Sequence, residues 1–177
     1  MELFDIHFFE ENYKNGQCRF EVGNTTISMF EWDDCYSIQT EQASPSMICS
    51  LKRFFADTLG LKEEGRYLKW GHTKIGVWKK YNCEGGIIEE TDYDKGWNVT
   101  WEKLIPFILA QGIKLGGIVD IFRFENKDNE RKDDLEFTNE RVWAIGQITK
   151  SDDEIIYYFD GDNGKLIEKT IRSLVNQ

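Results

Sequence analysis

The sequence has few of the residues from which catalytic sites are usually built. It contains only two histidines, His7 and His72, and neither lies in a Gly-x-Ser-x-Gly motif or beside a catalytic cysteine signature. Nucleophilic catalysis usually needs a base, most often histidine, next to the nucleophile. We therefore expect a binding protein rather than an enzyme.

The four cysteines also lack the spacing of a metal or redox site. Cys18, Cys35, Cys49 and Cys83 form no Cys-x-x-Cys pair, so neither a zinc cluster nor a thioredoxin-like site is predicted. Their even number permits two disulfides, but the first residues lack the basic start and apolar core of a signal peptide. We therefore expect reduced thiols and a cytoplasmic location.

Motifs for bound ions and cofactors are absent as well. The segment 160–164 resembles a calcium loop, but Gly164, Lys165 and Ile171 occupy positions where an EF-hand needs an oxygen ligand, a glycine and a glutamate. A hairpin turn explains the segment better. The sequence has no phosphate-binding Gly-x-x-x-x-Gly-Lys-Ser/Thr motif, and apolar runs such as Leu104–Ala110 are too short to span a bilayer. We predict no metal and no cofactor.

The charge balance is strongly acidic. The 32 acidic and 22 basic residues give a formal net charge of −10. Such a field repels nucleic-acid phosphates and anionic membrane surfaces, so neither is an expected partner. A basic protein partner is favoured, because complementary potentials speed encounter. The alternative is that the acidity only keeps the protein in solution.

Alternation of apolar and polar residues predicts a strand-rich first third. Residues 4–8 and 18–22 alternate with period two, and turns at Asn15-Gly16 and Gly23-Asn24 precede residues 17–22 and 25–32. We expect a three-stranded meander of residues 4–8, 17–22 and 25–32.

Two helices are expected. The first spans 45–59, with Ser44 as N-cap, Pro45 in the first turn, an apolar stripe at helical spacing and Gly60 as the stop. The second spans 101–111, between Thr100 and Gly112, although Pro106 interrupts its regular hydrogen bonding.

The remaining segments are predicted to be strands and loops. Strands are expected at 67–70, 75–81, 87–92, 117–124, 142–149 and 155–160, and the charge-dense segment 126–139 is expected to be an exposed loop. The tail after residue 164 fits either a strand or a short C-terminal helix. No composition shift or repeat divides residues 1–177, which predicts a single α+β domain built mainly from antiparallel β-sheet.

Two clusters combine acidic and aromatic residues. One lies within 84–101 and the other within 31–36. Interface hot spots favour Trp and Tyr, and surrounding acids steer a basic partner. The alternative is that the Trp side chains belong to the core and the acids are solvated. The predicted partner-binding residues are Glu89, Glu90, Asp92, Tyr93, Asp94, Trp97, Asp33 and Asp34.

Other functions stay open at this point. Two carboxylates at a set separation are enough for glycosidase chemistry, and Glu89, Glu90, Glu102 and Glu125 are candidates that sequence spacing does not rank. A small-molecule pocket lined by aromatic residues, or a homo-oligomer without another partner, would also suit the composition.

The chain resembles the small acidic immunity proteins with which bacteria neutralise toxins delivered by neighbouring cells, including those of contact-dependent growth inhibition. The resemblance covers size, net charge, a strand-rich pattern, reduced cysteines and clusters such as Glu89-Glu90-Thr91-Asp92-Tyr93-Asp94. It implies blockage of the active site or substrate groove of a basic toxin, with nucleases as one candidate class. The carboxylates would then stand in for nucleic-acid phosphates.

Overall fold

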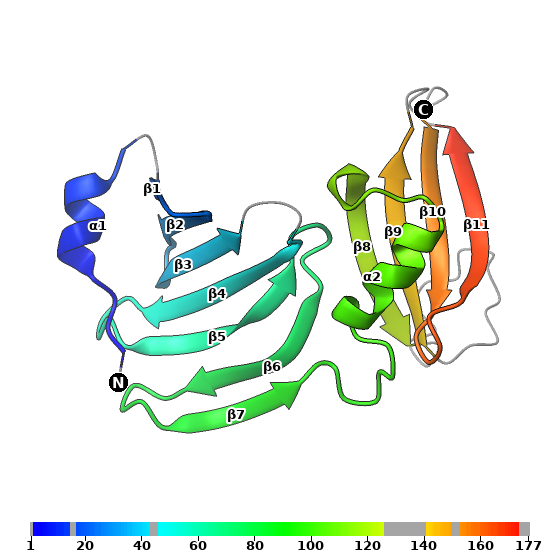
Figure 1. Cartoon of the computed structure of the whole chain (residues 1–177). Coiled ribbons are helices and arrows are strands. Elements are labelled where there is room, and N and C mark those ends of the chain that lie inside the picture. Colours follow the sequence, from blue (N-terminus) through cyan, green and yellow to red (C-terminus); the bar gives the residue numbers. More distant parts are fainter. Residues whose placement is uncertain (1, 15–16, 43–45, 126–140, 150–152, 174–177) are drawn as a thin grey trace. The chain divides into compact units, whose positions relative to one another are not determined.

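The described residues form two compact units. The computed structural model describes residues 2–14, 17–42, 46–125, 141–149 and 153–173 (Figure 1). One unit comprises Met1–Lys69 and Lys74–Tyr93, and the other comprises Trp70–Thr73 and Asp94–Gln177. We call them the N-terminal and C-terminal units. Whether they unfold as the single predicted domain is a question of cooperativity, so that expectation stays a prediction.

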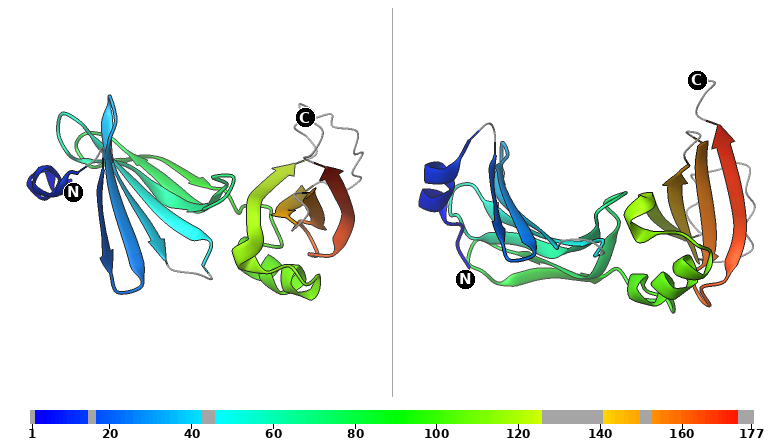
Figure 2. Two further views of the ribbon diagram at one scale, coloured as in Figure 1. Left: turned by 90° about the horizontal axis from the view of Figure 1, so that it is seen from above. Right: turned by 45° about the horizontal axis from the view of Figure 1, so that its top comes forward.

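The N-terminal unit contains a seven-stranded antiparallel sheet in which each strand pairs with the next along the chain (Figures 1 and 2). This meander needs only hairpin connections, as antiparallel strands allow. A helix, α1, precedes it. The elements are α1 (Ile6–Asn12), β1 (Cys18–Val22), β2 (Thr25–Glu31), β3 (Cys35–Gln42), β4 (Ile48–Phe55), β5 (Leu61–Leu68), β6 (Lys74–Tyr81) and β7 (Ile87–Asp92).

The predicted first strand, residues 4–8, is wrong. Residues from Ile6 onward form α1, because Asp5 caps the helix by accepting a hydrogen bond from the backbone N–H of Phe8 at 2.9 Å. The buried side chains are those of Phe4 and Phe9, whereas Phe8 is 38% exposed. The alternation of apolar residues in 4–8 therefore does not correspond to one face of a strand. The strands predicted at 17–22 and 25–32 are confirmed, and β3 was not predicted.

The predicted helix at 45–59 is also wrong. Residues Ile48–Phe55 form β4, the central strand of the sheet. Its side chains pack on both faces, with Phe54 on one and Cys49 on the other, both almost fully buried. A strand covered on both faces loses strict alternation, and its apolar residues then resemble a helical stripe. Ser44 and Pro45 lie outside the described residues.

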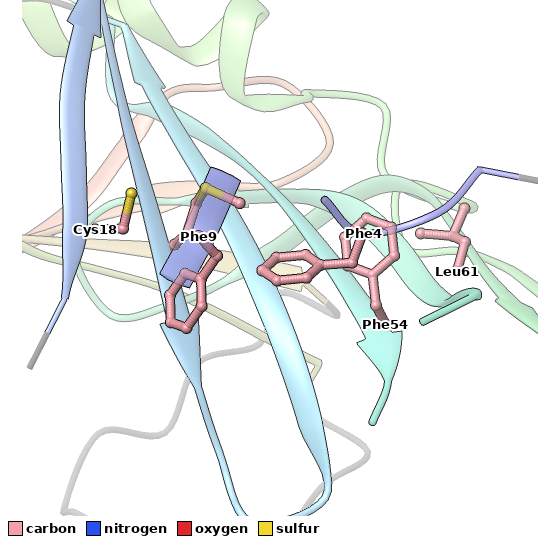
Figure 3. Packing of buried hydrophobic residues seen from close by; sticks show 6 residues of the cluster. Phe4, Phe9, Cys18, Phe54 and Leu61 are labelled. Atoms are coloured by element: carbon pink, nitrogen blue, oxygen red, sulfur yellow. The ribbon is translucent and has the colours of Figure 1, made fainter. Parts of the chain in front are cut away.

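The two faces of this sheet carry different side chains. The core face packs under α1 and the residues before it, as the close view of Phe4, Phe9, Cys18, Phe54 and Leu61 shows (Figure 3). On the opposite face Cys49, Tyr67 and Trp78 form a second buried cluster. We call this the aromatic face.

The C-terminal unit combines one helix with a four-stranded antiparallel sheet. Its elements are α2 (Trp101–Ala110), the short 3-10 helix η1 (Leu115–Gly117), β8 (Ile118–Glu125), β9 (Arg141–Ile148), β10 (Asp153–Asp160) and β11 (Leu166–Ser173). The strands are ordered β11-β10-β9-β8, and α2 lies across one face of them (Figure 1). Strands β8, β9 and β10 confirm the strands predicted at 117–124, 142–149 and 155–160.

Helix α2 confirms the second predicted helix, and it is continuous from Trp101 to Ala110. Pro106 lies inside it, and Gly112, with φ of +76°, follows its end. The residue before the helix, Thr100, has an extended backbone but makes no side-chain cap hydrogen bond. Trp101 packs against Trp143 of β9, with ring centroids 6.2 Å apart, so the amphipathic face of the helix meets the sheet.

For the residues after 164, the sequence left a strand and a short helix as alternatives. Residues Leu166–Ser173 form β11 and pair with β10, so this part is a strand and not a helix. The predicted loop at 126–139 and the Asn15-Gly16 turn lie outside the described residues. In the part of the chain that the structure describes, none of the helices has the length and apolar character needed to cross a bilayer.

Candidate functional site

Strand β7 lies at one edge of the N-terminal sheet and carries three of the eight predicted partner-binding residues, Glu89, Glu90 and Asp92. It pairs with β6 on one side, and no described strand pairs with it on the other. Its side chains are exposed apart from the half-buried Thr91. Ile87 is 54% and Ile88 65% exposed, so the strand begins with two adjacent apolar side chains in contact with solvent. An edge of this kind offers both backbone hydrogen-bonding groups and apolar contact area.

The β6–β7 register divides the acidic residues between the two faces of the strand. Glu89 lies opposite Lys80, and Glu90 opposite Lys79. Because side chains alternate, Glu90 and Asp92 share one face while Glu89 points to the other. The carboxylates therefore surround β7 instead of converging on one point.

Lysines of β6 partly neutralise these carboxylates. Lys80 Nζ lies 2.8 Å from Glu89 Oε2, and Lys79 Nζ lies 3.8 Å from Glu90 Oε2. The hydrogen bond with Lys80 lowers the pKa of Glu89, and the same contact raises the pKa of Lys80. All four side chains are exposed to solvent, which screens such pairs and leaves them free to exchange partners.

Tyr93, one residue beyond β7, belongs to an ordered cluster on the aromatic face. Lys74 Nζ lies 3.8 Å from the ring centroid of Trp78 and 5.4 Å from that of Tyr93. It also lies 3.3 Å from Glu63 Oε1, while Arg53 holds the other oxygen of this buried carboxylate at 3.0 Å. The cluster orients the Tyr93 ring, which stays 37% exposed beside the edge.

The position of Trp78 depends on a residue without a side chain. A Cβ atom at Gly65 would lie 2.2 Å from Cδ2 of the Trp78 ring. The ring therefore lies directly on the backbone of β5, where its Nε1 donates a hydrogen bond to the carbonyl oxygen of Arg66 at 2.8 Å. Gly65 thus positions Trp78, and Trp78 in turn positions Lys74.

The structure places Asp94 and Trp97 in the C-terminal unit. Trp97 is 8% exposed and packs edge-on against Trp143, with ring centroids 5.2 Å apart. Asp94 Oδ1 accepts a hydrogen bond at 2.6 Å from Arg123, which also lies over both indole rings. These two residues build the core of that unit and do not present themselves as surface anchors.

Asp33 and Asp34 lie in the turn between β2 and β3. Asp34 pairs with Lys62 at 2.8 Å, and this hydrogen bond lowers the pKa of Asp34. The neighbouring Trp32 is 59% exposed, and its Nε1 donates to Ser37 Oγ at 2.9 Å. The turn therefore presents an oriented indole ring beside two carboxylates.

These two acidic regions form separate surfaces. Strands β3 and β7 are four positions apart in the sheet order. At a spacing of about 4.8 Å per strand, they are separated by about 19 Å along the sheet. The predicted residues thus do not converge on one site, and β7 has the largest group of them.

The four carboxylates that the sequence offers for catalysis lie on three elements, β7, α2 and β8. Glu89 and Glu90 point to opposite faces, Glu102 lies exposed in the first turn of α2, and Glu125 pairs with Arg141 at 3.0 Å. No three His, Cys, Asp or Glu residues gather into a metal-binding group within the described ranges. In the β10–β11 turn, Asp160 accepts hydrogen bonds from the backbone N–H groups of Asp162 and Asn163, as a structural turn requires.

Comparison of the chain with protein-family models, with curated proteins and with solved structures finds no significant match. Functional assignment therefore rests on the chemistry of β7 and its neighbours.

Sequence reasoning missed the lysines that accompany the β7 acids. Lys79-Lys80 and Glu89-Glu90 lie on either side of the Gly85-Gly86 turn. This symmetric placement of opposite charges could have indicated that the two pairs face each other across a hairpin. It also missed Lys74 and Glu63, since residues eleven positions apart meet here only because β5 and β6 pair.

Proposed function

We propose that this protein binds a basic protein partner through β7 and thereby neutralises a toxin, as immunity proteins do. The observation that carries the proposal is the composition of this edge strand. All of its charged side chains, Glu89, Glu90 and Asp92, are acidic, and they follow directly after two exposed isoleucines. Apolar area supplies affinity and the acids supply attraction and register.

The net charge of the whole chain supports the same proposal. With a formal charge of −10, the protein attracts a cationic partner over distances of about a Debye length, roughly 8 Å at physiological salt. For a Lys or Arg of the partner to contact β7, Glu90 and Glu89 then only have to exchange part of their ion pairing with Lys79 and Lys80. Both pairs are exposed, so this exchange costs little.

The test is capture of a partner followed by localisation of its contact. The immobilised protein is exposed to lysate and secreted material of its source cells and eluted with a salt gradient. We expect a stoichiometric basic protein that leaves only at high salt and whose toxic activity, assayed first as nuclease activity, falls when this protein is added. Retention of no basic protein at low salt would refute the proposal.

A matched pair of variants separates the edge strand from the overall charge. Glu90→Lys on β7 and Glu21→Lys on β1 change the net charge equally, and both positions lie exposed on edge strands of the same sheet. We expect Glu90→Lys to weaken partner binding at least tenfold more than Glu21→Lys does. Equal losses would mean that only the net charge matters.

One observation favours a second candidate, a small-molecule binder or carboxylate enzyme. Glu63 is a buried acid, 8% exposed, on the aromatic face. It is held between Arg53 at 3.0 Å and Lys74 at 3.3 Å. A ligand screen that follows tryptophan fluorescence in wild type and Glu63→Gln distinguishes this candidate, because only a ligand on this face would respond to the substitution.

A further inference from the structure

We infer that the basic partner adds an extended segment to β7 as an eighth strand of the N-terminal sheet. The inference rests on the proposed function and specifies its binding mode. The segment supplies lysine or arginine side chains toward the β7 carboxylates and main-chain groups toward the open edge of the strand. Strand addition of this kind takes affinity from backbone hydrogen bonds and specificity from the flanking side chains.

The backbone of β7 shows which groups face the open edge. The N–H of Tyr93 donates to the carbonyl oxygen of Gly76 at 2.9 Å, so the main-chain groups of Tyr93 point toward β6. Between Glu89 and Tyr93 the register is regular, with Thr91 opposite Trp78 and Glu90 opposite Lys79. Main-chain groups alternate along a strand, so those of Glu90 point away from β6.

The negative charge of β7 determines which kind of strand can pair with its open edge. In an antiparallel twofold pairing of β7 with a second copy of itself, registers that place Glu90 opposite Glu90, Glu90 opposite Asp92 or Glu89 opposite Glu89 bring acids against acids. Like charges directly opposite each other destabilise a strand pair, and edge charges are a common protection against self-association. A strand with lysine or arginine at these positions meets the opposite sign and is favoured.

The other edge strands of the described sheets carry charged side chains of both signs or are covered. Strand β1 carries both Arg19 and Glu21, and β11 carries Glu168 together with Lys169 and Arg172. The edge of β8 is approached by the segment 70–73, in which Thr73 Oγ1 donates to the carbonyl oxygen of Ile121 at 2.7 Å. Strand β7 is thus the edge best suited to a basic segment.

The test uses a defined probe and two variants of one residue. The probe is a blocked six-residue peptide that alternates lysine with valine, titrated calorimetrically into the full-length protein at low salt. Glu90→Ala and Glu90→Pro both remove the carboxylate and its pair with Lys79. Only proline also removes the outward N–H, and the β6–β7 hydrogen bonds are kept because this group does not face β6.

We expect the peptide to bind Glu90→Pro at least tenfold more weakly than Glu90→Ala. A peptide N-methylated at alternate residues should also bind wild type at least tenfold more weakly, and this arm does not depend on the folding of a variant. Glutamine in place of lysine should abolish binding. Equal affinity for the two variants together with unchanged binding of the N-methylated peptide, or no binding of the lysine peptide to wild type, would overturn strand addition.

The two proposals fail separately. If a basic protein is captured and neutralised but the paired variants and the N-methylated peptide show no difference, the proposed function stands and the binding mode is wrong. If no basic protein is captured while the peptide binds with the expected pattern, β7 accepts a basic strand and the proposed neutralising function is wrong.

Discussion

Substitution of Gly65 by alanine tests the arrangement of the aromatic face most directly. The new Cβ atom would lie 2.2–2.5 Å from three atoms of the Trp78 ring, whereas carbon atoms in contact normally lie about 3.5–4.0 Å apart. The ring therefore has to move by about 1 Å. Trp78 is only 4% exposed, so it has little room to move without disturbing its neighbours.

The size of the effect follows from three contributions. Overpacking of a buried site costs about 1–3 kcal/mol. Displacement of the ring also weakens the hydrogen bond from Trp78 Nε1 to the carbonyl oxygen of Arg66, which contributes about 1 kcal/mol. Alanine is favoured over glycine in a strand by about 0.5–1 kcal/mol, which offsets part of the loss. We expect Gly65→Ala to lower the free energy of unfolding by about 2 kcal/mol.

Urea unfolding followed by far-ultraviolet circular dichroism measures this change. Gly116→Ala is a matched control, because among the described residues no atom beyond its chain neighbours and its own helix backbone lies within 4 Å of its Cβ position, and its φ is not positive. It should change stability by less than about 0.5 kcal/mol. A Trp78→Leu background should remove most of the Gly65→Ala penalty, since the clash is with the ring. A neutral or stabilising Gly65→Ala would refute the reasoning.

Four further outcomes are expected. Arg123→Ala should destabilise the protein by about 3 kcal/mol in urea unfolding, since it removes the buried cation that Asp94 faces; a loss below about 1 kcal/mol would contradict this. If residues 1–177 form one cooperative domain, Arg123→Ala and Gly65→Ala shift the same unfolding transition, whereas two separate unfolding transitions would show two domains. The hydrogen bond from Tyr81 to Glu64 at 2.6 Å, followed by burial, raises the pKa of Tyr81 to about 12. The tyrosine of an unfolded chain ionises near pH 10, so this stabilisation is complete below about pH 10 and is lost as the pH rises to about 12. Tyr81→Phe should flatten this part of the stability profile, and an unchanged profile would refute the assignment. Of the four cysteines only Cys83 is exposed, so one thiol should react rapidly with a disulfide reagent in the native protein and none in Cys83→Ser. Rapid reaction of a second thiol would contradict the buried positions of the others, where burial raises the thiol pKa values.

Local patterns predicted the elements whose side chains divide into one buried and one exposed side. Residues 18–22 alternate in polarity, and β1 is an edge strand with a single covered face. Residues 101–110 show a helical stripe, and α2 packs on a sheet with that stripe alone. In both cases one surface is buried, so the periodicity of the sequence matches the geometry of the element.

Prediction failed where that condition does not hold. Strand β4 is covered on both faces, and residues 4–9 combine an extended residue with a short helix, so neither keeps a single period. The candidate site was predicted in part for a similar reason. Glu89, Glu90 and Asp92 were found as an acidic run, but the burial of Trp97 depends on packing against Trp143, which is distant in sequence.

The sequence by itself determined the acidic charge, the strand-rich composition, the turn at Gly85-Gly86 and the run of carboxylates after Ile87-Ile88. These properties depend on composition and on neighbours within a few residues. The tertiary structure alone decided that β7 is an edge strand, that its acids point to both faces, and that Lys74, Glu63 and Trp78 meet on one face. Strand order and register arise from pairing between distant segments, and local periodicity carries no information about which segments pair.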